Sequence, residues 1–228
     1  MESKMKRKEE QIDELFVKKG PTSGVYSFAY ALKKLGVIES LSHEELKTWA
    51  EAVSFVDEEG HQKIKNGCDP VLLTKQIIDI IANQYSQQFK SVKLYFDINA
   101  YIEECQNAHT EFSKEETEKI AAILEKLKAE MKIFINNNHI NASYDFHDLN
   151  EKKVCIGLYI NHDYQNNNPK SGFLRLLLKN PTQLYYMMCF QEGNEENFYD
   201  PVWGYDNAQE HTGMLFQYTG IAIVLEKK

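Results

Sequence analysis

The chain has 228 residues, of which 43% are hydrophobic and 12% aromatic, the composition of a folded globular domain rather than a disordered segment. Acidic side chains outnumber basic ones by 34 to 26, and the formal charge of −8 argues against nucleic acid or an anionic membrane as the main partner. No apolar run is long enough to cross a membrane. Residues 1–14 are a mixed-charge run without the apolar segment of a signal peptide. We therefore expect a solvated lead-in over 1–14 and a single domain over 15–228.

The first predicted element is a helix that starts after Gly20-Pro21 and ends at Gly36. Gly20 and Pro21 break the preceding chain, and Thr22 or Ser23 is placed to cap the new helix. Apolar residues then recur at helical spacing, which predicts a buried central helix; they are Val25, Phe28, Ala29, Leu32 and Leu35. Ser23 lies at its N-terminus, where backbone N–H groups and the helix dipole favour negative charge.

The middle of the chain, from about 40 to 150, reads as mostly helical. Ser42 with Glu45, and Ser113 with Glu116, have the spacing of capping boxes, and Asp69-Pro70 is a helix start. These signals predict helices from 42 to 53, from 70 to 81 and from 113 to 134. A short strand is expected over 92–96, while 99–106 is ambiguous between helix and loop.

From Val154 onward the apolar residues come in short dense runs, as in strands. Strands are predicted over 154–160, 184–190 and 220–225, with a polar loop over 163–170 and a turn over 192–197. Helices first and an antiparallel sheet over 151–228 predict an α+β fold.

The cysteines and histidines do not form a recognisable metal or redox motif. Four scattered cysteines without a Cys-x-x-Cys pair are read as free buried thiols; they are Cys68, Cys105, Cys155 and Cys189. A metal site built from His139, His147 and Asp148 would have irregular spacing. We therefore predict no metal and no cofactor.

Two stretches carry a resemblance to a known family. Gly20-Pro-Thr-Ser-Gly24 resembles the Gly-Pro-Thr-Cys-Gly run that opens the nucleophile helix of papain-like cysteine proteases, including bacteriocin-processing and actin maturation proteases. Phe198-Tyr-Asp-Pro-Val-Trp-Gly204 resembles the C-terminal pattern of IpaJ-type bacterial effector proteases. Order and spacing agree from Ser23 to Leu225, but 40–150 matches nothing. The resemblance implies a papain-like fold, with the central helix packed on the C-terminal sheet.

The same resemblance implies a set of catalytic positions that are chemically degenerate here. Ser23 takes the nucleophile position, Tyr185 the imidazole position, Val17 the oxyanion-hole glutamine position, and Asp200 keeps the acid that orients the base. A tyrosine with a reference pKa of about 10 is no base near neutral pH. A serine nucleophile needs an adjacent base, and of the seven histidines only His162, after the 154–160 strand, is a substitute worth naming.

The resulting prediction is a pseudoenzyme of bacterial effector type that acts by binding a peptide or acylated segment of a partner, such as a lipidated host protein. The resemblance implies a role in virulence, with location in the bacterial cytoplasm before export and in the host cytoplasm afterwards. Its cleft would be lined by Ser23, Tyr185 and Asp200, together with binding residues Trp203, Tyr186 and Tyr26.

Two alternatives remain open. The chain is an active cysteine protease or acyl transferase if Ser23 replaces a natural Cys by engineering. It is a plain interaction protein if the resemblance around Asp200 is coincidental. The oligomeric state is not predicted.

Overall fold

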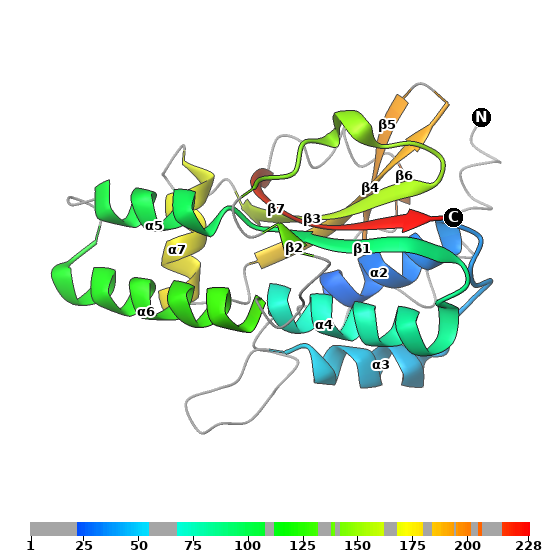
Figure 1. The fold of residues 1–228 in the computed structure, drawn as a ribbon, viewed down its shortest axis with the longest axis horizontal. Coiled ribbons are helices and arrows are strands. Elements are labelled where there is room, and N and C mark those ends of the chain that lie inside the picture. The colour runs from blue at the N-terminus through cyan, green and yellow to red at the C-terminus, as the bar shows by residue number, and fades with distance from the viewer. Residues whose placement is uncertain are drawn as a thin grey trace.

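The computed structural model describes residues 22–54, 68–107, 112–131, 138–139, 142–161, 168–179, 184–193, 195–201, 205–206 and 216–228. The fold is α+β, with helices on one face of a single sheet (Figure 1). The α-helices are α2 (Ser23–Lys34), α3 (His43–Ala52), α4 (Pro70–Ile80), α5 (Ile98–Asn107), α6 (Lys114–Met131) and α7 (Pro169–Lys179). The strands are β1 (Phe89–Tyr95), β2 (Asn138–His139), β3 (Lys153–Asn161), β4 (Leu184–Glu192), β5 (Glu195–Asp200), β6 (Tyr205–Asp206) and β7 (Phe216–Lys227). A π-helix, η2 (Ile81–Tyr85), extends α4, and a 3₁₀ turn, η3 (Phe146–Asp148), precedes β3.

The helix starts follow the capping chemistry of the sequence. The Ser42–Glu45 capping box is present at α3, and the Asp69 side chain accepts from the first free N–H groups of α4. The Ser113–Glu116 pair makes the same reciprocal bonds before α6. Gly36 has φ +63° after α2, a left-handed conformation that glycine adopts without a steric penalty.

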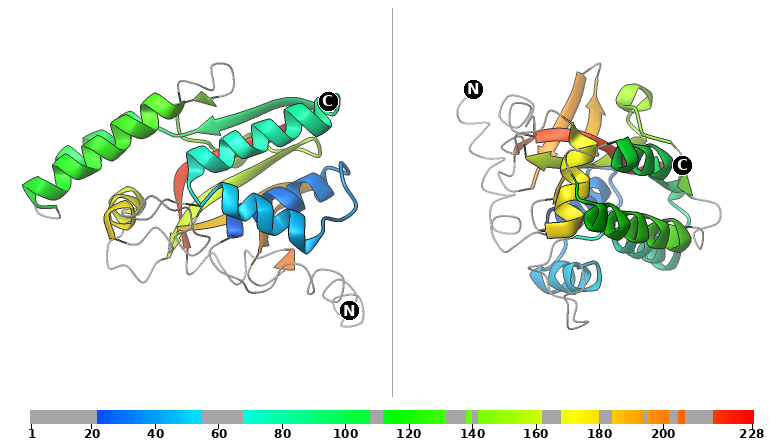
Figure 2. Two further views of the ribbon diagram at one scale, coloured as in Figure 1. Left: turned by 90° about the horizontal axis from the view of Figure 1, so that it is seen from below. Right: turned by 90° about the vertical axis from the view of Figure 1, so that its left-hand side faces the viewer.

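The sheet has the strand order β2-β1-β7-β3-β4-β5-β6, and every pair is antiparallel except β1 with β2. The late strand β7 lies inside the sheet, between β1 and β3. Helices α5, α6 and α7 pack together at one end of the sheet, while α2, α3 and α4 lie beneath the rest of it (Figures 1 and 2).

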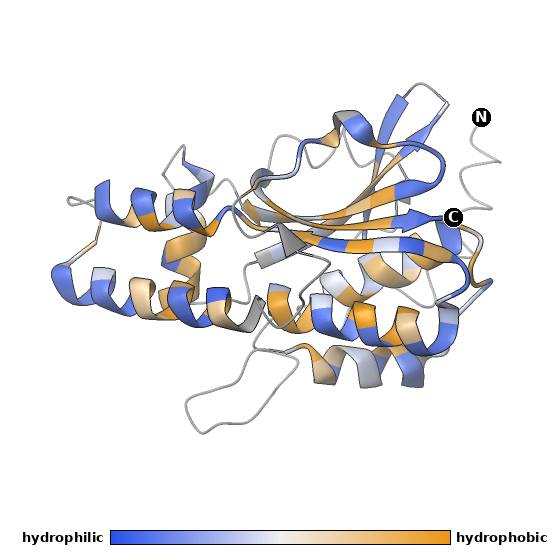
Figure 3. Cartoon of the chain, viewed as in Figure 1, coloured by the Kyte–Doolittle hydropathy of each residue, from blue (hydrophilic) through white to orange (hydrophobic). Residues whose placement is uncertain are grey.

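Alternation along the strands gives the sheet two different faces. On β4, Tyr186, Met188 and Phe190 join the main core beneath the helices; we call this side the helix face. Tyr185 and Met187 alternate to the other side, which we call the aromatic face. Half-buried aromatic side chains border that face; they are Tyr95, Phe146, Tyr185, Phe198 and Tyr218. In Figure 3 apolar residues gather along the central strands and in α2 and α4.

The predicted α+β class is confirmed, as are the strands over 154–160, 184–190 and 220–225. The ambiguous segment 99–106 is helical, within α5. The sequence does not predict helix α7, because the polar run over 163–170 favours a loop. The helix begins at Pro169, and its apolar side, including Phe173 and Leu174, is buried in the main core. The predicted lead-in over 1–14 lies outside the described residues.

Candidate functional site

The start of α2 is tied to the backbone of β4. The Ser23 hydroxyl accepts a hydrogen bond from the Tyr186 N–H at 3.0 Å. One helical turn later, the Ser27 hydroxyl donates to the Tyr186 carbonyl at 3.2 Å. Both serines are buried, with 7% and 0% of their surface exposed. Two side chains of α2 therefore satisfy both backbone groups of one strand residue.

The end of β5 explains why that residue needs them. Met188 pairs with Tyr199, and the same register continued by two residues would set Pro201 opposite Tyr186. Proline has no N–H to donate, and β5 ends at Asp200. A buried backbone group without a partner is costly, so the serine hydroxyls stand in for the missing strand. In this geometry Ser23 is a hydrogen-bond acceptor.

Tyr185 and Asp200 meet on the neighbouring strands β4 and β5. The Tyr185 phenol donates a short hydrogen bond to the Asp200 carboxylate. Asp200 is 1% exposed, whereas Tyr185 is only half-buried. The pair joins a partly accessible aromatic ring to a buried acid, and a phenol held by a carboxylate is a donor rather than a base at neutral pH.

The structure thus brings together two of the predicted site residues and sets the third apart. Ser23 belongs to a helix packed on the helix face, and it touches the backbone of Tyr186. Tyr185 alternates to the aromatic face, with Asp200 bonded to it there. Ser23 thus meets β4 at its backbone, while the Tyr185 phenol leaves the strand toward the aromatic face. Ser23 therefore bonds a backbone N–H, and Tyr185 bonds a carboxylate.

The remaining predicted residues differ in their availability. Tyr186 is 1% exposed and its hydroxyl donates to the Cys68 carbonyl at 3.1 Å, so it is a core residue rather than a surface for a partner. Tyr26 on α2 is half-buried, and burial raises the pKa of its phenol. Val17, in the oxyanion position, and Trp203 lie outside the described residues.

The predicted histidines fall outside what the structure describes: His162 lies outside the described residues, and so do the side chains of His139 and His147. Asp148, the third member of the imagined metal site, instead binds Tyr144 and Lys153. Within the part of the chain that the structure describes, no group of three His, Cys, Asp or Glu side chains is arranged to hold a metal ion.

Tyrosines from three strands continue the aromatic face beyond Tyr185. Tyr185 pairs with Tyr159 on β3, and Tyr159 pairs with Tyr218 on β7, so the three form one row across the sheet. The rings of Tyr159 and Tyr218 are 5.3 Å apart, and the Tyr159 hydroxyl lies 3.3 Å from the Cys189 sulfur. Burial raises the pKa of the Tyr159 phenol well above its usual value. This row was not predicted, because cross-strand neighbours depend on a register that the sequence does not reveal.

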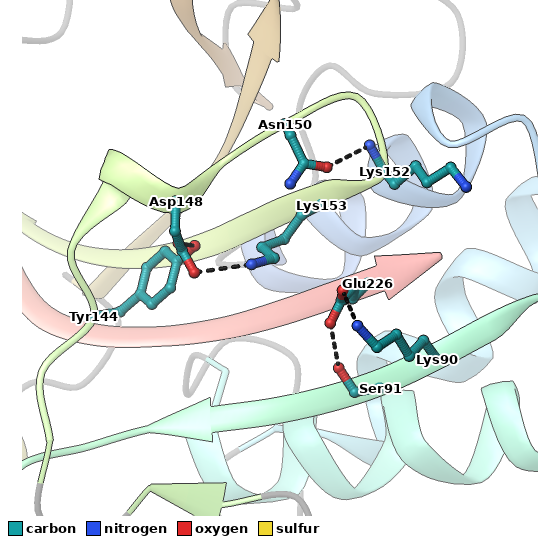
Figure 4. A network of polar contacts seen from close by, with 8 residues as sticks. All are labelled: Lys90, Ser91, Tyr144, Asp148, Asn150, Lys152, Lys153 and Glu226. Atoms are coloured by element: carbon teal, nitrogen blue, oxygen red, sulfur yellow. Dashed lines mark hydrogen bonds and ion pairs between the residues drawn. The ribbon is translucent and has the colours of Figure 1, made fainter. Parts of the chain in front are cut away.

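Ion pairs stabilise the exposed margin of the same region (Figure 4). Asp148 accepts from the Tyr144 hydroxyl and from Lys153 at 2.9 Å. Partial burial raises the pKa of the Asp148 carboxyl, but these hydrogen bonds outweigh it, and the net pKa lies below the usual value. Farther along, Lys90 and Ser91 of β1 donate to Glu226 of β7 at 2.7 and 3.2 Å. These contacts tie the 142–150 segment to β3 and the end of β7 to the start of β1.

Fold and site together define an α+β protein with a helix-covered sheet. The other face of the sheet carries aromatic rings, and the half-buried Tyr185 is bonded there to the buried Asp200. No protein family, curated protein or solved structure matches this chain. Among the described residues, no helix combines the length and the apolar character that a membrane crossing requires.

Proposed function

We propose that this protein is a catalytically degenerate member of the papain-like fold that acts by binding a peptide or acylated segment of a partner protein. The observation that carries the proposal is the Tyr185–Asp200 hydrogen bond between adjacent strands. In the resemblance described above, these two positions belong to the imidazole and to the acid that orients it. An orienting acid that holds a phenol keeps an aromatic group in place but activates nothing.

The environment of Ser23 supports the same proposal. A serine nucleophile requires an adjacent base that accepts its proton. Here the hydroxyl accepts a hydrogen bond from the Tyr186 N–H, and Tyr185 extends from the opposite face of β4. Contacts to a bound ground state persist without catalytic groups, since those groups act mainly in the transition state. Delivery into a host cell and a lipidated host partner belong to the proposal through the resemblance alone.

The binding surface that we assign comprises the half-buried rings of Tyr185 and Phe198 on the aromatic face, with Asp200 beneath Tyr185. Aromatic side chains bury large areas at a small cost in side-chain entropy and are frequent hot spots. Peptide or acyl chains offer complementary apolar groups. The rings therefore suit an extended segment better than a small polar ligand.

The test combines turnover and binding. Ser23→Cys, checked by circular dichroism for folding, should hydrolyse neither unmodified nor N-myristoylated peptides, because Tyr185 forms no thiolate–imidazolium pair. Robust turnover by this variant would instead favour the active cysteine protease or acyl transferase.

For binding, proteins captured from host-cell lysate on the parent chain are identified, and matching acylated and unacylated peptides are titrated. Tyr185→Ala should weaken the interaction by about 2 kcal/mol, the usual hot-spot scale. Tyr85→Ala, a half-buried tyrosine of η2, is the matched control and should have no effect. If Tyr185→Ala binds as well as the parent while a change elsewhere abolishes capture, the aromatic face is not the binding surface.

A further inference from the structure

A second candidate site lies beside the tyrosine row and is independent of the Tyr185–Asp200 pair. It is a surface hollow of about 570 Å³ between the 142–146 segment, the first turn of α7 and β7. That volume lies within the range of small-ligand sites. Its lining includes Tyr144, Phe146 and Tyr218 on one side and Pro169 and Lys170 on the other.

The aromatic side of the hollow is preformed. The rings of Phe146 and Tyr218 are 4.6 Å apart, and Tyr144 meets Phe146 edge to face at 5.9 Å. The hydroxyls of both tyrosines already donate hydrogen bonds within the protein. Tyr144 donates to Asp148, and Tyr218 donates to the Tyr144 carbonyl at 3.2 Å. What this wall offers a ligand is therefore aromatic surface, which suits another ring.

The floor is fixed by a close approach of two backbones. The Tyr144 N–H donates to the Gly220 carbonyl at 3.2 Å. Gly220 has φ +85°, and a Cβ there would lie 2.9 Å from the Ser143 hydroxyl oxygen. A side chain at position 220 would be strained and would push this segment away from β7.

The opposite wall is equally anchored and carries a positive charge. Asn168 accepts from the Lys170 N–H at 3.0 Å, and both Asn168 and Ser171 donate to Glu104, at 2.8 and 2.7 Å. Lys170 itself is half-buried. In the described ranges its ammonium has no ion-pair partner, and the N-terminal end of α7 adds partial positive charge nearby. Asp145, exposed on the facing rim, is the one carboxylate among the lining residues.

We propose that this hollow binds an aromatic ring that carries a carboxylate, with the ring against Phe146 and Tyr218 and the carboxylate on Lys170. A charge-assisted hydrogen bond to the ammonium would orient the ligand, while ring contacts would supply apolar burial. Such a group occurs as a free aromatic acid or as the C-terminal aromatic residue of a peptide. The proposal does not depend on the proposed function, since it uses neither Tyr185 nor Asp200.

The experiment is a titration of the full nitrogen-15-labelled chain with N-acetylphenylalanine, followed by two-dimensional NMR. We expect chemical-shift changes at Lys170, Thr219 and Gly220. The dissociation constant should be about 1 mM, as is typical of a small ligand. N-acetylphenylalanine amide, which lacks the charge, should bind about tenfold more weakly, the usual scale for a charge-assisted hydrogen bond. A peptide ending in Phe distinguishes the sources: tighter binding than the free acid indicates a chain terminus.

Two variants make the assignment falsifiable. Lys170→Gln should weaken binding about tenfold, and Lys152→Gln, an exposed lysine outside the hollow, should not. The proposal would be overturned by equal affinity for the amide or by unchanged binding of Lys170→Gln. It would also be overturned if no shifts appeared at a ligand concentration of about 10 mM.

Discussion

At the scale of single residues, the serine in the motif that resembles a nucleophile has a structural task. Ser23 and Ser27 complete the hydrogen bonding of Tyr186 where the neighbouring strand ends. A cysteine would be a poorer substitute, because a thiol is a weak acceptor. The hydrogen bonds of Ser23 therefore explain why a serine stands at position 23 without any catalytic role.

Ser23→Ala should lower the free energy of unfolding by about 1–3 kcal/mol, since it leaves the buried Tyr186 N–H without its acceptor. Urea denaturation followed by circular dichroism measures the loss. Partner binding at the aromatic face should be unchanged, because the Ser23 hydroxyl bonds the backbone of Tyr186, whose side chain lies on the helix face. An unaltered midpoint would show that another group replaces the hydroxyl at no cost.

Asp148 should make stability depend on acid pH. Its folded-state pKa is lowered, so the unfolded chain binds the proton more readily than the folded one. The contribution is present above the unfolded pKa of about 3.9 and is lost as pH falls through the folded value.

Because the Asp148 side chain is 56% exposed, solvent screens the ion pair and the contribution should stay below about 1 kcal/mol. Comparing Asp148→Asn with the parent by denaturation at pH 7 and pH 3 gives the measurement. The difference between the two proteins should shrink at the lower pH. A constant difference would mean that the variant disturbs packing rather than charge.

At the scale of elements, α2 approaches its neighbours so closely that one position must be glycine. A Cβ at Gly24 would lie 2.7 Å from Leu73 Cδ2 and 2.9 Å from the Cys68 sulfur, and it would also crowd the Tyr186 ring at 3.2 Å. Gly24, like Ser23, thus belongs to the packing of α2 on β4 and α4.

Gly24→Ala should therefore destabilise the fold by about 1–3 kcal/mol through overpacking, although alanine favours helix by about 1 kcal/mol. Thermal unfolding of the variant provides the test. In the same background, Leu73→Val should cost less than it does in the parent, because a shorter side chain relieves the clash. A variant as stable as the parent would show that α2 shifts freely.

What the sequence predicts about elements depends on whether the signal is local. Capping acts within a few residues, so it can be recognised in the sequence. The capping boxes of Ser42 and Ser113 predict the starts of α3 and α6, and Gly36 predicts the end of α2. Helix α7 was missed because an asparagine-rich run precedes it and hides its start at Pro169. Its burial against Ile160 and its bonds to Glu104 depend on long-range packing.

The candidate site was predictable only in part for the same reason. Tyr185 and Asp200 were singled out through the resemblance, and they do meet. The role of Ser27, the tyrosine row and the hollow near Lys170 require strand register and face, which a one-residue slip would reverse. Tyr186 illustrates the point: it was grouped with Tyr185 as a binding residue, yet alternation buries it under α2.

At the scale of the whole molecule, the interior position of β7 in the sheet has a consequence for biosynthesis. Its neighbours β1 and β3 are translated well before residues 216–227, and the registered pair Val92–Leu225 joins distant parts of the chain. Until the ribosome has released this strand, the two earlier strands have no partner between them. We therefore expect folding during synthesis to pause with an open sheet, whose unpaired edges are prone to aggregation.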